Sequence, residues 1–229
     1  MTDRAWKRLN SQIIACRRCP RLVAHCEKIA AEKRRAFQDW EYWGRPVPNF
    51  GDPAARLLIV GLAPAAHGAN RTGRMFTGDR SGEWLFRALH RAGFASQPAS
   101  TDVDDGLTLT DCAITAVCHC APPDNKPTSE EIAHCREWLT ETFAQLPARV
   151  FLALGQIGFK AILKEARDRG WYEGKLPKFG HGVQVPLSEG RVLLASYHPS
   201  QQNTFTGRLT EAMFDDIFTT ARRLLKAPE

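Results

Sequence analysis

The sequence lacks the features that would place it in a membrane or among the nucleotide hydrolases. None of its apolar runs approaches the ~18 residues that a membrane-spanning helix requires. Its first residues, MTDRAWKRLNSQ, hold no apolar core of a secretory signal, so we expect a cytoplasmic protein, in the nucleoid if its partner is DNA. It has no G-x-x-x-x-G-K-[ST] loop and no dense carboxylate cluster for Mg²⁺, which argues against a nucleotide hydrolase.

Internal repeats and low-complexity segments are also missing, and what remains has an ordinary globular composition. The 229 residues are 43% hydrophobic and 24% charged, and this length suits one domain. The formal net charge of +6 favours a polyanionic partner such as nucleic acid, although charge alone does not establish one. We expect a monomer.

Short apolar runs alternate with helical patterns after residue 54. Buried strands are predicted at 56–61, 112–118, 149–154 and 191–196. Helices are predicted at 2–15, 21–38, 80–93, 128–145, 155–169 and 208–226. The pattern predicts a single α/β domain with a four-stranded, mainly parallel sheet flanked by helices. Residues 1–53 form an N-terminal helical and loop segment of this domain, and 54–229 form its α/β core.

Three unusual loops follow the predicted strands. They span 62–80, 119–126 and 197–208. Ligands of parallel sheets bind beyond the carboxyl ends of the strands, so we expect the three loops to build one site there.

Seven cysteines are many for a cytosolic chain, and their odd number argues against a simple disulfide framework. Four of them have a spacing that suits a four-thiolate centre: Cys16, Cys19, Cys120 and Cys135. Such a centre holds an iron–sulfur cubane or structural zinc, and the lack of a second C-x-x-C favours the cluster while zinc stays open. The other three, Cys26, Cys112 and Cys118, are expected to be small buried hydrophobes.

The first loop combines glycines with groups that suit a nucleobase or a phosphate. Phe76 lies among glycine and polar residues, where it serves either as a stacking platform for a base or as a packing anchor. Arg71 and Arg74 are candidates to meet phosphates. Asp79 is the loop's only carboxylate, and it either serves catalysis or caps the helix that begins at Arg80.

The last loop brings a histidine to the end of a buried strand. His198 is placed there to hydrogen-bond to a reacting group, although a lone histidine is more often structural. Polar residues follow it as far as Arg208, which is expected to start the final helix.

Three long motifs, in order along the chain, resemble the type-b (family 5) uracil-DNA glycosylases. They are Y-W-G-R-P-V-P-x-F-G-D-P, G-L-A-P-A-A-H-G-x-N-R-T-G-R-M-F-T-G-D-R-S-G and H-P-S-x-x-N-T-x-T-G-R-L-T. The resemblance runs from about residue 12 to 220. It implies a monofunctional DNA-repair glycosylase that flips uracil out of DNA and hydrolyses its N-glycosidic bond, leaving an abasic site.

The resemblance also implies roles for individual residues. A structural 4Fe–4S cluster would be held by Cys16, Cys19, Cys120 and Cys135, tying the N-terminal helices to the core. Phe76 would stack on the base and His198 would contact its carbonyl oxygen. The other candidates for the base are Ala63, Asn125 and Asn70. The loop after His198 would enter the DNA, with contacts from Ser200, Gln201, Asn203 and Arg208.

Two departures from the type-a relatives bear on substrate range. Leu62 stands where those enzymes have an acidic residue near the attacking water, and Ala116 where they have an asparagine that reads uracil. Type-b enzymes share both losses, which imply a looser pocket that also accepts hypoxanthine, xanthine or ethenocytosine. The competing hypothesis is an iron–sulfur or zinc nucleic-acid-binding protein without glycosylase activity.

Overall fold

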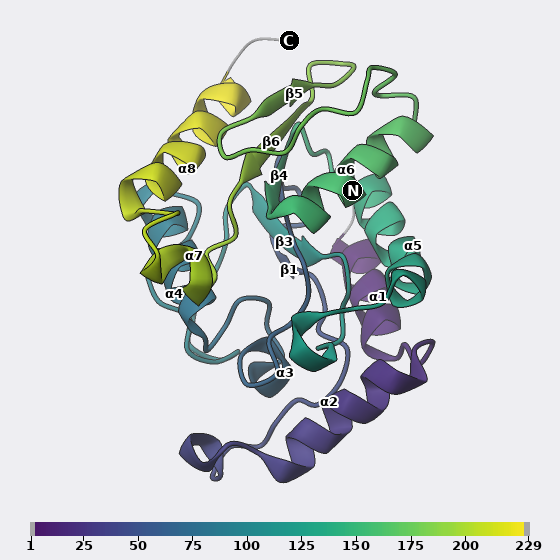
Figure 1. Cartoon of the computed structure of the whole chain (residues 1–229), viewed down its shortest axis with the longest axis vertical. Coiled ribbons are helices and arrows are strands. Elements are labelled where there is room, and N and C mark those ends of the chain that lie inside the picture. Colours follow the sequence, from purple (N-terminus) through teal and green to yellow (C-terminus); the bar gives the residue numbers. More distant parts are fainter. Residues whose placement is uncertain (1–2, 227–229) are drawn as a thin grey trace.

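The computed structural model describes residues 3–226, which fold around one mixed sheet (Figure 1). Its strands are β1 (Phe50–Gly51), β2 (Leu57–Gly61), β3 (Cys112–Ala116), β4 (Val150–Leu154), β5 (Gln184–Pro186) and β6 (Val192–Ser196). Their order in the sheet is β1-β3-β2-β4-β6-β5. β3, β2, β4 and β6 are parallel, whereas β1 and β5 pair antiparallel at the two edges.

The four predicted strands are therefore confirmed as the centre of the sheet, but the count of four was wrong. The sheet has six strands because two short segments add to its edges. β1 is two residues long inside the Pro/Gly-rich stretch, and β5 is three residues long and ends in Pro186. Segments so short show no hydrophobic period of their own.

Helices connect the strands. They are α1 (Asp3–Ile14), α2 (Pro20–Glu32), α3 (Ala69–Thr72), α4 (Arg80–Arg91), α5 (Ser129–Gln145), α6 (Gln156–Asp168), α7 (Gln201–Phe205) and α8 (Glu211–Lys226), with 3₁₀ turns η1 (Arg35–Phe37) and η2 (Pro123–Asn125). The predicted helix 21–38 stops at Glu32, and the predicted helix 208–226 begins at Glu211 instead; residue 2 of the first prediction lies outside the described residues. Between residues 3 and 226, no helix combines the length and hydrophobicity needed to cross a bilayer.

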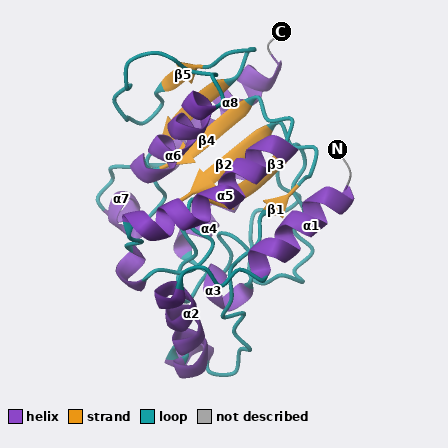
Figure 2. Cartoon of the chain, turned by 90° about the vertical axis from the view of Figure 1, so that its right-hand side faces the viewer, coloured by secondary structure: helices purple, strands orange, loops and turns teal. Residues whose placement is uncertain are grey.

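The central strands are buried on both faces, which explains their continuous apolar runs. Along β2, Leu57 and Ile59 face a core formed with α4 and α8. Leu58 and Val60 face the opposite core, formed with α5 and α6. Figure 2 shows the sheet between these helical layers.

The N-terminal helices are tied to α5. α1 packs against α5, while α2 lies at the lower end of the molecule in both views (Figures 1 and 2). Arg18 pairs with Glu137 of α5, and Arg21 Nε lies 2.7 Å from Glu131 Oε1. Glu131 also closes a capping box with Thr128, which fixes the start of α5. These contacts bring the cysteines of the first segment beside the core.

Candidate active site

A cavity of about 630 Å³ opens at the carboxyl ends of the parallel strands. All three predicted loops contribute to its wall. Leu62 and Ala63 follow β2, Asn125 belongs to η2 after β3, and His198 follows β6. The expectation that the loops meet at this edge is confirmed, because the parallel strands deliver their ends to one side of the sheet.

Phe76 and His198 face each other in this cavity although they lie far apart in sequence. Their ring centroids are 6.0 Å apart, with an angle of 30° between the ring planes. Phe76 has a φ of 56°, which is unusual for a residue with a side chain and costs energy that the surrounding loop must offset. A Cβ atom at Gly82 would lie 1.7 Å from the Phe76 carbonyl oxygen, so only glycine fits where the start of α4 meets this loop.

His198 is held as a neutral imidazole. Burial lowers the pKa of His198 to about 4, so the ring carries no charge near neutral pH. The loop behind it is fixed by Asn203, whose Nδ2 donates to the His198 carbonyl oxygen at 2.8 Å. A neutral imidazole presents one N–H donor without the desolvation cost of a buried cation.

Asp79 is the predicted N-cap of α4 and also lies at the cavity, where its catalytic role stays a prediction. As the cap, its Oδ1 accepts from the Gly82 N–H at 3.0 Å. Burial raises the pKa of Asp79 above its usual value, and hydrogen bonds from the backbone N–H groups of Gly82 and Ser81 offset only part of that effect.

The remaining wall is mostly uncharged. Leu62 and Ala116 both line the cavity, so the two departures noted in the sequence lie on its surface. Asn125, with a φ of 56°, stands at its mouth with an exposed side chain. Ser200 and Gln201 enter from the start of α7. The cavity thus combines an aromatic ring, a neutral imidazole and the carboxylates of Asp79 and Asp124 with a mostly apolar wall.

Comparison with known proteins places this arrangement in a family. Residues 48–222 match the model of the uracil DNA glycosylase superfamily. The chain belongs to this superfamily. It is 54% identical over 218 residues to the Type-5 uracil-DNA glycosylase of Mycobacterium leprae, covering 94% of each chain. It is 52% identical over 213 residues to the Type-5 enzyme of Thermus thermophilus, covering 93% of this chain and 94% of the relative. A Type-4 uracil-DNA glycosylase of Pyrobaculum aerophilum is 30% identical over 189 residues, or 78% of this chain and 80% of the relative.

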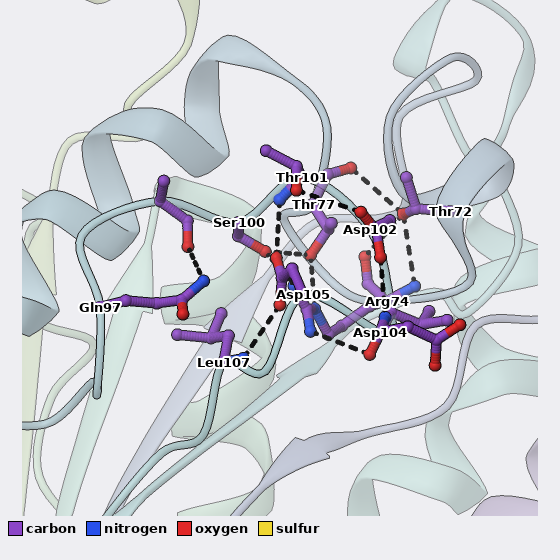
Figure 3. Close-up of polar contacts among 12 residues, drawn as sticks. Thr72, Arg74, Thr77, Gln97, Ser100, Thr101, Asp102, Asp104, Asp105 and Leu107 are labelled. Atoms are coloured by element: carbon purple, nitrogen blue, oxygen red, sulfur yellow. Dashed lines mark hydrogen bonds and ion pairs between the residues drawn. The ribbon is translucent and has the colours of Figure 1, made fainter.

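Arg74 does not reach the surface in this superfamily member, which corrects its expected contact with DNA. Its guanidinium is buried, and Nη2 lies 2.6 Å from Asp105 Oδ2 and 2.7 Å from Ser100 Oγ, while Nε lies 2.9 Å from Thr77 Oγ1 (Figure 3). Burial alone would raise the pKa of Asp105, but the hydrogen bonds from Arg74 and nearby backbone N–H groups hold it at about 2. This network fastens segment 100–105 behind the loop that carries Phe76.

Arg71 is likewise engaged inside the glycosylase fold. It is 3% exposed, and Nε donates to the His67 carbonyl oxygen at 2.8 Å. Its guanidinium carbon lies 4.0 Å from the ring centroids of both Phe37 and Trp40. The arginine thus clamps the first loop to the η1 segment rather than presenting its charge to a phosphate.

Asn70 and Asn203 also serve the scaffold. Asn70 is fully buried behind the first loop, where Nδ2 lies 3.4 Å from the Cys26 carbonyl oxygen, so it does not contact a base. Asn203 uses its amide on the His198 carbonyl. Arg208 is exposed and lies with its guanidinium carbon 4.6 Å from the Tyr197 ring centroid, so its contact with DNA stays a prediction.

The residues that sequence reasoning missed include Arg80 and its neighbour Phe205. Arg80 lines the cavity, and its guanidinium carbon lies 4.8 Å from the ring centroid of Phe205. Phe205, on α7, is 68% exposed. The signal in the sequence was an aromatic residue within the polar loop that follows His198.

The four predicted ligand cysteines converge in the fold. Cys16 and Cys19 from the α1–α2 connection, Cys120 after β3 and Cys135 on α5 all line one small cavity. Burial raises the pKa of Cys19 to about 11, and the neighbouring Cys135 adds to this effect. Cys26 and Cys118 are buried hydrophobes as expected, yet they are not remote. Cys26 packs in one cluster with Cys120 and donates to the Ala121 carbonyl oxygen at 3.7 Å, and Cys118 lies in the cluster against which Cys135 packs.

The residues around this second cavity fit a group that accepts hydrogen bonds. The backbone N–H of His119 donates to Cys135 Sγ at 3.3 Å. Trp138 Nε1 is a buried donor beside the cysteines with no partner within residues 3–226. His119 Nε2, also unpartnered there, is an acceptor, because the neutral ring donates from Nδ1 to the Val47 carbonyl oxygen at 2.7 Å. No three His, Cys, Asp or Glu side chains in that range are arranged to hold a single metal ion. The cysteines instead surround a space.

Proposed function

We propose that this protein is a uracil-DNA glycosylase that hydrolyses the N-glycosidic bond of uracil in DNA and leaves an abasic site. The observation that carries this function is the pairing of Phe76 with His198 in one cavity at the carboxyl ends of the strands. Its volume of about 630 Å³ lies within the range of small-molecule sites, so one everted nucleotide fits. Membership in the superfamily supports the same reaction.

Binding begins with removal of the base from the stack, which costs a few kcal/mol. The ring of Phe76 offers a stacking surface that replaces part of the lost interaction. Ser200 and Gln201 at the start of α7 line the cavity, and exposed Phe205 at its end packs against Arg80, another lining residue. An apolar ring at such a place suits insertion between base steps. Arg208 lies beside this loop and supplies a cation for the phosphates.

Bond cleavage develops positive charge on the sugar and negative charge on the departing base. The neutral His198 donates a hydrogen bond to the base oxygen that gains charge, and a preorganised donor of this kind is worth ~3 kcal/mol. Asp79, as a carboxylate, stabilises the sugar cation or orients the attacking water. Leu62 and Ala116 add no polar group that reads uracil, which favours a broad range including hypoxanthine, xanthine and ethenocytosine.

We also propose a structural 4Fe–4S cluster at Cys16, Cys19, Cys120 and Cys135. Two observations support the cluster. The four cysteines line a small cavity instead of converging on the position of a single ion, and the Nε1–H of Trp138 beside them has no partner among the described residues. Zinc is the weaker candidate, because a single tetrahedral ion with bonds of ~2.3 Å needs four sulfurs that converge on a point. When bound, the cluster would tie α1 and α2 to α5 and take no part in hydrolysis.

The function is tested by incubating the protein with duplexes that each contain one modified base. Alkali then cleaves abasic sites, and the products are measured for uracil, hypoxanthine, xanthine and ethenocytosine. We expect excision of uracil and of at least one other base. Excision of uracil alone would contradict the broad range, and excision of none would favour the competing nucleic-acid-binding protein, which does not account for the Phe76–His198 cavity.

The buried carboxyl of Asp79 predicts how the excision rate depends on pH. Because burial raises its pKa, the protonated acid persists to higher pH than in an exposed aspartate, so the excision rate is expected to rise as the carboxylate forms. Single-turnover rates between about pH 4.5 and pH 8 should show this acidic limb in the wild type. Asp79→Asn keeps a good N-cap for α4 but is expected to lose the limb and most activity. Superimposable profiles for the two proteins would restrict Asp79 to capping.

A further inference from the structure

Trp138 lies where it can act on the proposed cluster. It stands on α5, three residues after Cys135 and so on the same face of the helix. Its side chain is 6% exposed and lines the cysteine cavity. It packs with Leu9 and Ile13 of α1, against Cys16 and Cys135. The indole therefore joins the N-terminal helix to two of the proposed ligands.

The indole N–H of this tryptophan has no hydrogen-bond partner among the described residues, although the atom is buried. A donor left in this state costs about 1–3 kcal/mol, so buried donors nearly always have an acceptor. Leu9 and Ile13 offer none, and Arg18, whose guanidinium carbon lies 4.8 Å from the Trp138 ring centroid, is itself a donor. The sulfurs of Cys16 and Cys135 pack against the indole and carry lone pairs, and His119 Nε2 is a further buried acceptor in the same cavity. Sulfur becomes a far better acceptor once it is a thiolate that binds iron.

We propose that Trp138 donates its Nε1–H to a sulfur of the cluster site, at Cys16 or Cys135, and thereby sets the reduction potential and the retention of the cluster. The inference rests on the cluster proposed above. Hydrogen bonds to cluster sulfurs are among the protein's means of setting potential, because they stabilise the more negative reduced state. Cys135 Sγ already accepts from the His119 backbone N–H, so a second donor would complete a polar shell around it.

The test compares wild-type protein, Trp138→Phe and the control Trp84→Phe, all purified without oxygen. Phenylalanine keeps an aromatic ring beneath Arg18 but removes the N–H. Trp84 stands on α4, against Phe214 in the core on the other face of the sheet, so it does not contact the cysteines. We expect Trp138→Phe to have a more negative reduction potential and to lose visible absorbance to an iron chelator about fivefold faster, whereas Trp84→Phe behaves as the wild type.

A second measurement does not depend on how the variant folds. Wild-type protein carrying ¹⁵N-labelled indole is reduced, and electron–nuclear double resonance is used to detect coupling between the cluster spin and one indole nitrogen and its exchangeable proton. Coupling is expected. If no coupling is detected, or if Trp138→Phe and Trp84→Phe have equal potentials and lose their clusters at equal rates, the proposed role of Trp138 is wrong. The proposal of the cluster itself would still stand. Wild-type protein without iron and without visible absorbance overturns both proposals, whatever its glycosylase activity.

Discussion

Replacing His198 by alanine is expected to lower the single-turnover rate of uracil excision by about one to two orders of magnitude while DNA binding stays measurable. The ring is neutral near pH 7, so its removal takes away a hydrogen-bond donor and no charge. The loss should therefore appear in the chemical step, and the dependence of DNA affinity on salt should keep its slope. Rapid-quench excision and fluorescence anisotropy at several salt concentrations measure the two quantities.

A matched control is His90→Ala, which removes an exposed histidine from the end of α4. It should leave both the rate and the affinity unchanged. An unchanged excision rate in His198→Ala would remove this residue from the mechanism. A loss confined to DNA affinity would instead make His198 a binding residue, because a group that acts in the transition state lowers the rate of the bound complex.

Replacing Cys135 by alanine is expected to abolish iron binding and to lower the free energy of unfolding by ~3 kcal/mol or more, since a structural metal centre contributes its binding energy to folding. The thiol stands between the loop after β3 and the α1–α2 connection. Without it, α1 and α2 should become the first segments that a protease cleaves. Iron content, visible absorbance, thermal unfolding and limited proteolysis with mass spectrometry test each part.

Cys112→Ala serves as the control for this loss, because Cys112 is a buried thiol of β3 in the core packed by α4 and α8. It should retain iron and lose only about 1–2 kcal/mol by leaving a small cavity. If Cys135→Ala kept its iron and its N-terminal helices stayed resistant, the four-cysteine centre would be wrong. Zinc in place of iron in the wild-type protein would replace the cluster but keep the same ligands.

The sequence predicted the parts of the fold whose signal is local. Leu57–Gly61 and Val150–Leu154 are buried on both faces, so their apolar runs were sufficient to identify strands. Phe50–Gly51 and Gln184–Pro186 became strands only because β3 and β6 offered free edges, and a partner strand cannot be read from two or three residues. The helix Gln201–Phe205 was missed for the same reason, since five residues hold too little pattern.

The candidate site divides in a similar way. Phe76, Asp79 and His198 stood out because an aromatic, a carboxylate and an imidazole are conspicuous among small polar residues at strand ends, and all three line the cavity. Arg71 and Arg74 stand in the same loop but point inward. Arg74, for example, pairs with Asp105, which lies 31 residues later in the chain. No sequence pattern around Asp105 predicts this contact. Whether an arginine faces solvent depends on such tertiary partners.

The two borders of the sheet bear on how these molecules behave when many gather on one nucleic acid. β1 ends at Gly51, with a φ of 123°, and β5 ends at Pro186, whose nitrogen carries no hydrogen to share. Edge strands this short and irregular expose few backbone groups that a strand of a neighbouring copy could hydrogen-bond to. Edge-to-edge aggregation is therefore disfavoured. Many copies of a DNA-binding protein can lie close together on one DNA molecule. A low tendency to self-associate through sheet edges keeps such copies separate while they search for damaged bases.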